Sequence, residues 1–221
     1  APNFFTQEEY EAIEEWQEGP LGPPQGAARS YFEKAESIAP LIRDLRGTTH
    51  FDAGLDFSQG FALLLPHLSS MREVCRISSH LARRATATGD QNAAVEWIGT
   101  LNEISSHSGQ DGTAIGSLVG AAMYMRSDQT MELAIANGLI DAETAATVLE
   151  SMSMLREETD PFHFGNSVTG ERLLFNQTLD SILGAKGSPL SDETLDVYRS
   201  AFGDGAVEEI LELSDSGDGI R

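Results

Sequence analysis

The side chains best suited to chemistry in this sequence are five histidines and a single cysteine. His67, Met71 and Cys75 follow one another at every fourth position, which places an imidazole, a thioether and a thiol on one face of a helix. Nitrogen and soft sulfur ligands in line could hold a metal such as copper. The same spacing is typical of an apolar core stripe, and we favour that interpretation, with His67 lining or capping the core.

A second group of polar residues surrounds the stretch DPFHFGNS, residues 160–167. Asp160, His163 and Glu171 lie near one another in the sequence, and together with His67 they define an alternative function, a metal-binding protein or hydrolase. A histidine in an ordered loop is more often a simple hydrogen-bonding group. Glu171 and Arg172 could instead form a buried ion pair that fixes two helices, and we favour this structural role for them.

Three arginines, Arg72, Arg76 and Arg83, lie on the side of a predicted helix opposite its apolar stripe. They form the one basic stripe that the sequence predicts on an acidic molecule. The stripe could dock an acidic partner, or it could pair with the glutamate-rich helices of the chain itself. We favour the pairing within the chain.

Sequence motifs of the common enzyme classes are absent. The chain has no HExxH or HxxxH, no CxxC, no GxSxG and no GxxxxGK[ST]. A structural zinc site, a serine hydrolase of the common type and a nucleotide-binding loop therefore have no support. We assign no catalytic, cofactor-binding or metal-binding residue and predict no cofactor, and the sequence favours a protein without catalytic activity over an enzyme.

The charge of the chain restricts its partners. Aspartate and glutamate total 35 against 14 lysines and arginines, a formal net charge of −21. Nucleic acid and anionic membrane surfaces would repel such a chain, and no apolar run is long enough to span a bilayer. The chain begins with Ala1-Pro2, so the compartment stays open: an exported or envelope-associated protein whose signal or anchor was removed, or a cytoplasmic one.

Apolar residues recur at spacings of three and four along most of the chain, which predicts an all-α fold of about eight or nine helices. Thr6 and Glu9 have the spacing of a capping box, and Pro66 suits the first turn of a helix. Antiparallel hairpins in a TPR-like or irregular bundle are the expected arrangement. The expected helices cover residues 6–17, 27–45, 66–88, 91–107, 111–136, 141–156, 168–183, 191–202 and 205–213.

Two segments carry more specific expectations. Phe61 to Leu65 reads as a short buried turn that leads into the amphipathic helix at Pro66. The helix at 111–136 is apolar nearly all round in its first half, which predicts a central buried helix. Gly112, Gly116 and Gly120 recur every four residues, so we expect them to let a neighbouring helix approach closely. A homodimer built on this glycine-lined helix is the alternative.

Residues 50–175 resemble a large family of uncharacterised helical proteins that is abundant in planctomycete bacteria. The motifs that carry the resemblance are Asp56-Phe57, Phe61, Leu65-Pro66-His67-Leu68, Gly89-Asp90, Ala93-Ala94, Leu118-Val119 and Gly170-Glu171-Arg172. The resemblance implies a helical-hairpin, TPR-like fold, often behind an N-terminal anchor or signal, and it implies no known activity. The 34-residue period of true TPR repeats is absent.

Together these patterns predict a helical arm and Pro/Gly linker at residues 1–26, a single all-α domain at 27–213 and a frayed acidic tail at 214–221. The function we expect is a protein–protein interaction module or scaffold. Its partner would be a protein or peptide that the sequence does not identify.

Overall fold

The computed structural model describes residues 4–45, 48, 50–141, 143–146, 148 and 160–183, with a few single positions between 196 and 208. Every regular element within these ranges is a helix, and none of the described residues forms a strand. The all-α class that the apolar spacing predicts is therefore confirmed. No helix in the described ranges is long and apolar enough to cross a membrane.

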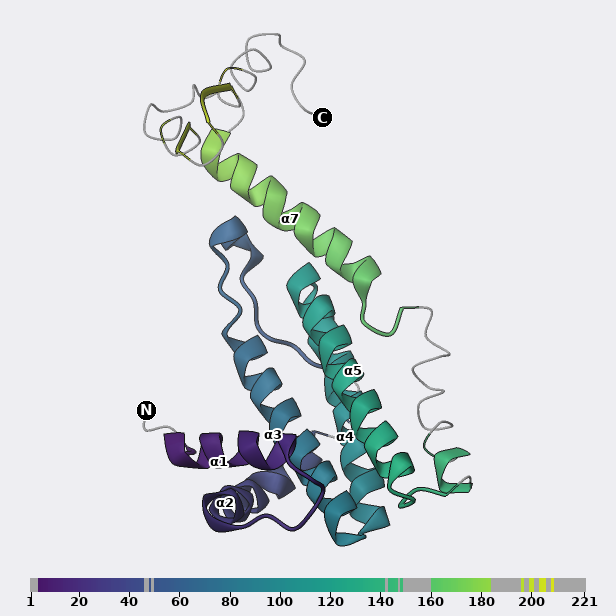
Figure 1. Ribbon diagram of the computed structural model, residues 1–221. Coiled ribbons are helices and arrows are strands. Elements are labelled where there is room, and N and C mark those ends of the chain that lie inside the picture. The colour runs from purple at the N-terminus through teal and green to yellow at the C-terminus, as the bar shows by residue number, and fades with distance from the viewer. Residues whose placement is uncertain are drawn as a thin grey trace. The chain divides into compact units, whose positions relative to one another are not determined.

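Figure 1 shows the elements in chain order, with short connections from α1 to α2, from η1 to α3 and from α3 to α5, and longer ones before η1 and before α7. Six α-helices have defined bounds in the described ranges, fewer than the eight or nine expected, and the predicted helices at 191–202 and 205–213 fall largely outside those ranges. The predicted tail at 214–221 lies outside them as well. In chain order the elements are α1 (Gln7–Glu18), α2 (Gly26–Arg43), η1 (Phe57–Ala62), α3 (Pro66–Thr88), α4 (Gln91–Ser108), η2 (Gly109–Asp111), α5 (Ala114–Ala136) and α7 (Phe164–Leu183).

The chain forms two compact units. The first contains residues 1–55 and 64–171, and the second contains residues 56–63 and 172–221. In the second unit, η1 packs on α7: Gly60 has a φ of 54° and lies so close to Thr178 that a Cβ would collide with its side chain. A glycine is required there for both reasons.

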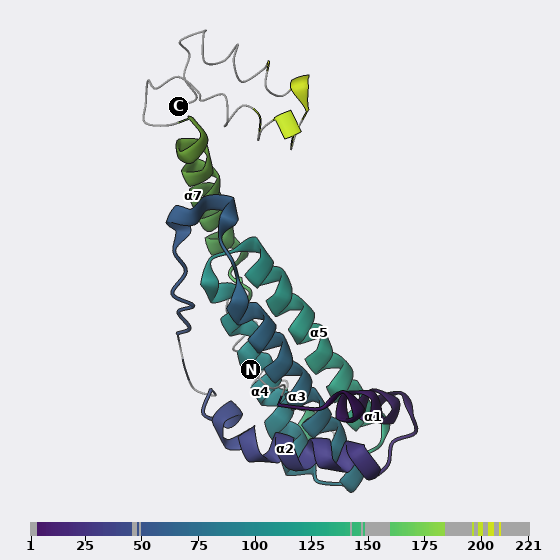
Figure 2. The same cartoon turned by 90° about the vertical axis from the view of Figure 1, so that its left-hand side faces the viewer.

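Helices α3, α4 and α5 lie side by side and carry the core of the first unit (Figures 1 and 2). The predicted Gly-Asp turn joins α3 to α4: Gly89 ends α3 in the left-handed region at φ 75°, and Asp90 caps α4 by accepting a hydrogen bond from Ala93 N–H at 3.0 Å. Ile98 and Leu101 of α4 are completely buried. The apolar residues spaced by three and four therefore lie on the helix faces that pack against one another in the core.

Helices α1 and α2 lie across the carboxy-terminal part of α3 (Figures 1 and 2). The capping box forms as the sequence predicts, because Thr6 N–H donates to Glu9 and Glu9 N–H donates to the Thr6 hydroxyl. Phe5 and Ile13 are buried, and the Phe5 ring stacks on Tyr31 of α2 with centroids 4.2 Å apart. Phe5 and Ile13, which lie in the segment predicted to be an arm, belong to the core of the first unit.

Two expectations about burial are also wrong. Leu64 is 78% exposed, so the segment that leads into α3 is not a buried turn. Helix α5 is not buried all round either, since Ile115, Leu118 and Met125 are 53%, 61% and 63% exposed. Helix α5 has its most extensive contacts with α3, α4 and η2, and these side chains lie outside them.

Candidate functional site

A buried polar cluster lies at the start of α5, formed by His67, Asp111 and Thr113. The Asp111 carboxylate is completely buried. One of its oxygens accepts hydrogen bonds from the Thr113 N–H at 2.7 Å and the Thr113 hydroxyl at 2.9 Å, and the other accepts from His67 Nε2 at 2.9 Å. Thr113 in turn caps α5, because its hydroxyl oxygen accepts from Gly116 N–H. The cluster ties the first turn of α3 to the first turn of α5.

Two of the predicted glycines make this packing possible. A Cβ at Gly116 would collide with the Asp111 carboxylate, and a Cβ at Gly120 would lie 2.5 Å from the Ser105 carbonyl oxygen of α4. The expected close approach therefore occurs at these two positions. Gly112 has another role, since it ends η2 at a φ of 76°. Gly116 and Gly120 face the interior of the first unit, so they do not supply a surface for a homodimer.

Glu171 joins the same end of α5, because its carboxylate accepts a hydrogen bond from Ala114 N–H at 2.9 Å. A carboxylate is favourable at this position, where helix N–H groups have no partner within the helix. The expected ion pair with Arg172 is wrong: Arg172 is exposed, and no ion pair joins these two residues. Glu171 instead fixes α7 to α5 through a backbone group.

Asp160 and His163 begin α7. The Asp160 carboxylate accepts hydrogen bonds from Phe164 N–H at 2.8 Å and from Gly165 N–H at 2.6 Å. His163 takes a left-handed backbone conformation, with a φ of 56°, and it is the one residue other than glycine with a positive φ among the residues that the structure describes. Both residues therefore define how the chain enters α7.

Of the four residues of the alternative metal or hydrolase site, His67 pairs with Asp111, Glu171 binds Ala114 N–H, and Asp160 and His163 lie together just before α7. No described group of three histidine, cysteine, aspartate or glutamate side chains is arranged to hold a metal ion. The His67–Asp111 pair resembles an acid–base pair, but Thr113, the hydroxyl beside it, already donates to Asp111 and accepts from Gly116. His67 Nδ1 is buried without a hydrogen-bond partner in the part of the chain that the structure describes.

The His67–Met71–Cys75 face gives no support for a soft metal. Cys75 is 2% exposed, and burial raises the pKa of its thiol to about 11. The thiolate that a metal would need is therefore disfavoured at neutral pH. Cys75 belongs to the core cluster, and Met71 packs against that cluster.

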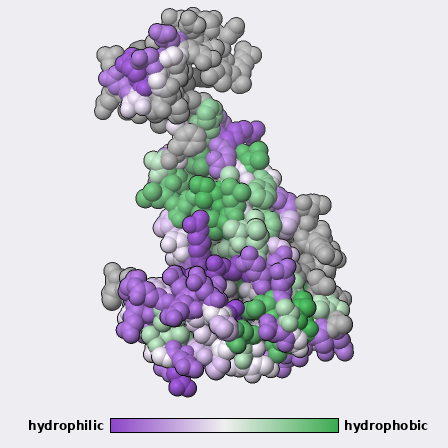
Figure 3. Space-filling view, viewed as in Figure 1, coloured by the Kyte–Doolittle hydropathy of each residue, from purple (hydrophilic) through white to green (hydrophobic). Residues whose placement is uncertain are grey.

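A groove with a volume of about 690 Å³ lies between α3 and α5 in the first unit. Its floor is apolar, made by Cys75, Val119 and Met123, which are buried. Figure 3 shows hydrophobic side chains over the amino-terminal half of α5 and hydrophilic ones over α1. We call this feature the α3–α5 groove; its lining consists of Ser69, Arg72, Glu73, Cys75, Arg76, Ile115, Leu118, Val119, Ala122, Met123 and Arg126.

Arginines from both helices line the groove. Arg76 is fixed in place, because it pairs with Glu73 of its own helix and its guanidinium lies 4.5 Å from the centre of the Tyr10 ring. Arg72 and Arg126 form no ion pair with any described residue. They leave the groove with two cationic groups that nothing in the described chain neutralises.

The third member of the predicted basic stripe, Arg83, lies apart from the groove. It donates a hydrogen bond to the Gly19 carbonyl oxygen at 2.9 Å, and its guanidinium lies 5.2 Å from the centre of the Trp16 ring. Arg83 therefore anchors the end of α1, and the three arginines of the stripe have three different roles.

Sequence reasoning missed the α5 wall of the groove. Ile115, Leu118, Ala122 and Arg126 have spacings of three and four and therefore share a helix face. Because apolar residues occupy nearly every face of the first half of this helix, the sequence alone could not distinguish the exposed face from the buried ones. Arg126 was the available signal, since an arginine at the end of an apolar stripe often marks solvent.

Comparison of the chain with protein-family models, with curated proteins and with solved structures finds no match.

Proposed function

We propose that this protein is a helical interaction module that binds a segment of another protein in the α3–α5 groove. The observation that carries the proposal is the exposed apolar face of α5, where Ile115 and Leu118 are 53% and 61% exposed beside a groove of about 690 Å³. Grooves between packed helices are common binding sites for partner helices.

The energetics favour occupation of the groove. Each aliphatic side chain that moves from water to an apolar surface contributes about 25 cal/mol per Å² of buried area. The exposed parts of Ile115 and Leu118 would be covered by a bound segment, together with the apolar side chains of that segment. The apolar floor is already formed by buried side chains of the core, so little reorganisation is required.

The test is affinity capture with the full chain and two matched variants. Leu118→Asp places a carboxylate in the groove, whereas Leu41→Asp places one on α2, where Leu41 is 67% exposed and outside the groove lining. We expect proteins captured by the wild type and by Leu41→Asp to be lost with Leu118→Asp, while circular dichroism shows that all three chains are folded. Equal capture by Leu118→Asp and the wild type would refute a role for the groove.

A further inference from the structure

The charge of the α3–α5 groove is opposite to that of the rest of the chain. The groove is lined by three arginines and one glutamate, on a chain of formal net charge −21. Elsewhere in the first unit, cationic side chains are largely neutralised from within: Lys34 pairs with Glu9 at 2.7 Å, Arg43 pairs with Glu96 at 3.0 Å, and Arg84 pairs with Glu36. Arg72 and Arg126 therefore bring two cationic groups, unpaired among the described residues, together in one groove of a strongly acidic chain.

The two arginines without ion pairs are placed to act on the same ligand. Arg72 belongs to the α3 wall and Arg126 to the α5 wall, with the apolar floor between the two helices. Arg126 is half-buried, so a carboxylate that reaches it loses less of its attraction to solvent screening than one on an open surface. A guanidinium is also suited to paired hydrogen bonds with a carboxylate.

The dimensions of the groove indicate the size of the ligand. From Ile115 to Arg126 the α5 wall spans 12 residues, and the 11 steps between them rise about 16 Å at 1.5 Å per residue. A helical segment of about three turns has this length. Such a segment could place aliphatic side chains over Ile115 and Leu118 and a carboxylate near each free arginine.

We propose that the ligand of the α3–α5 groove is an acidic amphipathic helix of another protein, and that Arg72 and Arg126 select it by its carboxylates. The proposal rests on the interaction function proposed above and adds the chemistry of the partner. A fatty acid would offer one carboxylate to a groove with charges on both walls. A second copy of this chain is the other source of acidic helices, and the experiment separates the two.

The probe is a displayed library of amphipathic peptides of about 15 residues, long enough for four turns. Leucine or isoleucine occupies positions spaced by three and four, and the remaining positions vary among glutamate, glutamine and lysine. The full-length protein is the bait. We expect selection for glutamate, and we expect the best glutamate peptide to bind at least tenfold more tightly than its glutamine counterpart in fluorescence anisotropy, with a difference that shrinks as salt is raised.

The variants assign the selectivity to the two arginines. Arg72→Gln/Arg126→Gln is expected to lose most of the preference for glutamate over glutamine while still binding the glutamine peptide. Arg29→Gln is the control, because Arg29 is exposed on α2, has no ion pair with a described residue and lies outside the groove lining. It should bind as the wild type does.

Three outcomes would overturn the proposal. If glutamate and glutamine peptides bind equally well and both are lost with Leu118→Asp, the groove binds partners but does not select acidic ones. If no peptide is enriched, an acidic helix is not the ligand, whatever the capture experiment gives. If light scattering shows a dimer of the wild type that Leu118→Asp dissociates, the occupant is a second copy of this chain.

Discussion

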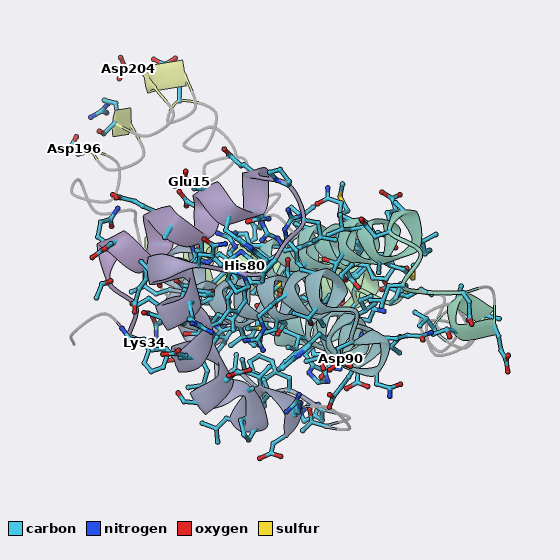
Figure 4. The ribbon with its side chains drawn as sticks, turned by 60° about the horizontal axis from the view of Figure 1, so that its bottom comes forward. Glu15, Lys34, His80, Asp90, Asp196 and Asp204 are labelled. Carbon is cyan, nitrogen blue, oxygen red and sulfur yellow. The ribbon has the colours of Figure 1, made fainter. Side chains whose placement is uncertain are left out.

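His80 Nδ1 lies 3.0 Å from the hydroxyl oxygen of Tyr31, in the interior of the first unit where α1, α2 and α3 meet (Figure 4). The other ring nitrogen, Nε2, lies 3.1 Å from the amide oxygen of Gln17. Because an amide oxygen can only accept, Nε2 carries the proton and Nδ1 accepts from the Tyr31 hydroxyl. The network is therefore complete only while the imidazole is neutral.

The first prediction is that this network makes the fold sensitive to acid. Burial, together with the positive charges of Arg126, Arg76 and Arg83, lowers the pKa of His80 to about 3. The unfolded chain takes up a proton below the ordinary value of 6.5, so the contribution of neutral His80 is complete above that pH and is lost as pH falls toward 3. At pH 5 the loss amounts to roughly 2 kcal/mol of unfolding free energy.

Urea unfolding at pH 7 and pH 5 tests this, with His80→Gln compared against the wild type. The glutamine variant should lose less stability between the two pH values. His50→Gln is the control, since His50 is exposed and its removal should leave the wild-type difference unchanged. Parallel behaviour of wild type and His80→Gln would contradict the assignment.

The second prediction concerns the contact between Gly116 and Asp111. Gly116→Ala places a methyl group against the buried carboxylate, which must leave its position or force α5 away from η2. We expect a loss of about 1–3 kcal/mol from overpacking, and more if Asp111 is displaced from His67 and Thr113. Chemical unfolding measures it. Gly22→Ala is the control, because its Cβ would meet nothing closer than 4.0 Å, and a similar loss in both variants would argue against a specific contact.

The third prediction separates a structural from a catalytic Asp111. Asp111→Ala removes the acceptor of three hydrogen bonds, from His67 Nε2, the Thr113 N–H and the Thr113 hydroxyl. Leaving buried donors without partners costs about 1–3 kcal/mol each, so we expect a loss of several kcal/mol and partial unfolding of the first turn of α5. Hydrogen exchange at Gly116 and Ser117 should rise. Asp52→Ala, in an exposed loop, should cost less than about 1 kcal/mol, and near-equal losses would contradict a special role for Asp111.

The helices and their ends could be predicted from the sequence more completely than the partners of the candidate site residues, and the reason is physical. The Thr6–Glu9 capping box and the Gly89-Asp90 turn depend on residues a few positions apart, so their spacing in the sequence is also their relationship in space. His67 and Asp111 are 44 positions apart, and which partner His67 finds depends on how two helices pack. The alternative metal site finds no support among the described residues, because Asp160 and His163 lie at a helix start, where backbone N–H groups bind the Asp160 carboxylate.

The exposed wall of the α3–α5 groove could not be predicted from local spacing either. Helix α5 is apolar nearly all round in its first half, and apolar content alone indicates burial. Whether a neighbour covers Leu118 depends on the number of helices around α5, which local spacing does not encode. The spacing of the arginines likewise predicts one basic face. In the structure Tyr10 and Glu73 hold Arg76 in place and Trp16 holds Arg83, so only part of that face carries free charge.

The last prediction concerns the strained start of α7. His163 has a φ of 56°, in the left-handed region that costs a residue with a side chain on the order of 1 kcal/mol relative to glycine. His163→Gly should relieve this strain, whereas His163→Ala keeps it while removing the imidazole. We therefore expect the glycine variant to be more stable than the alanine variant by about 1 kcal/mol in thermal or urea unfolding, with both variants capturing the same partners as the wild type. If the alanine and glycine variants are equally stable, the backbone at His163 is not strained; if both lose partner capture, the imidazole itself contributes to binding and the assignment of His163 to the helix start alone is wrong.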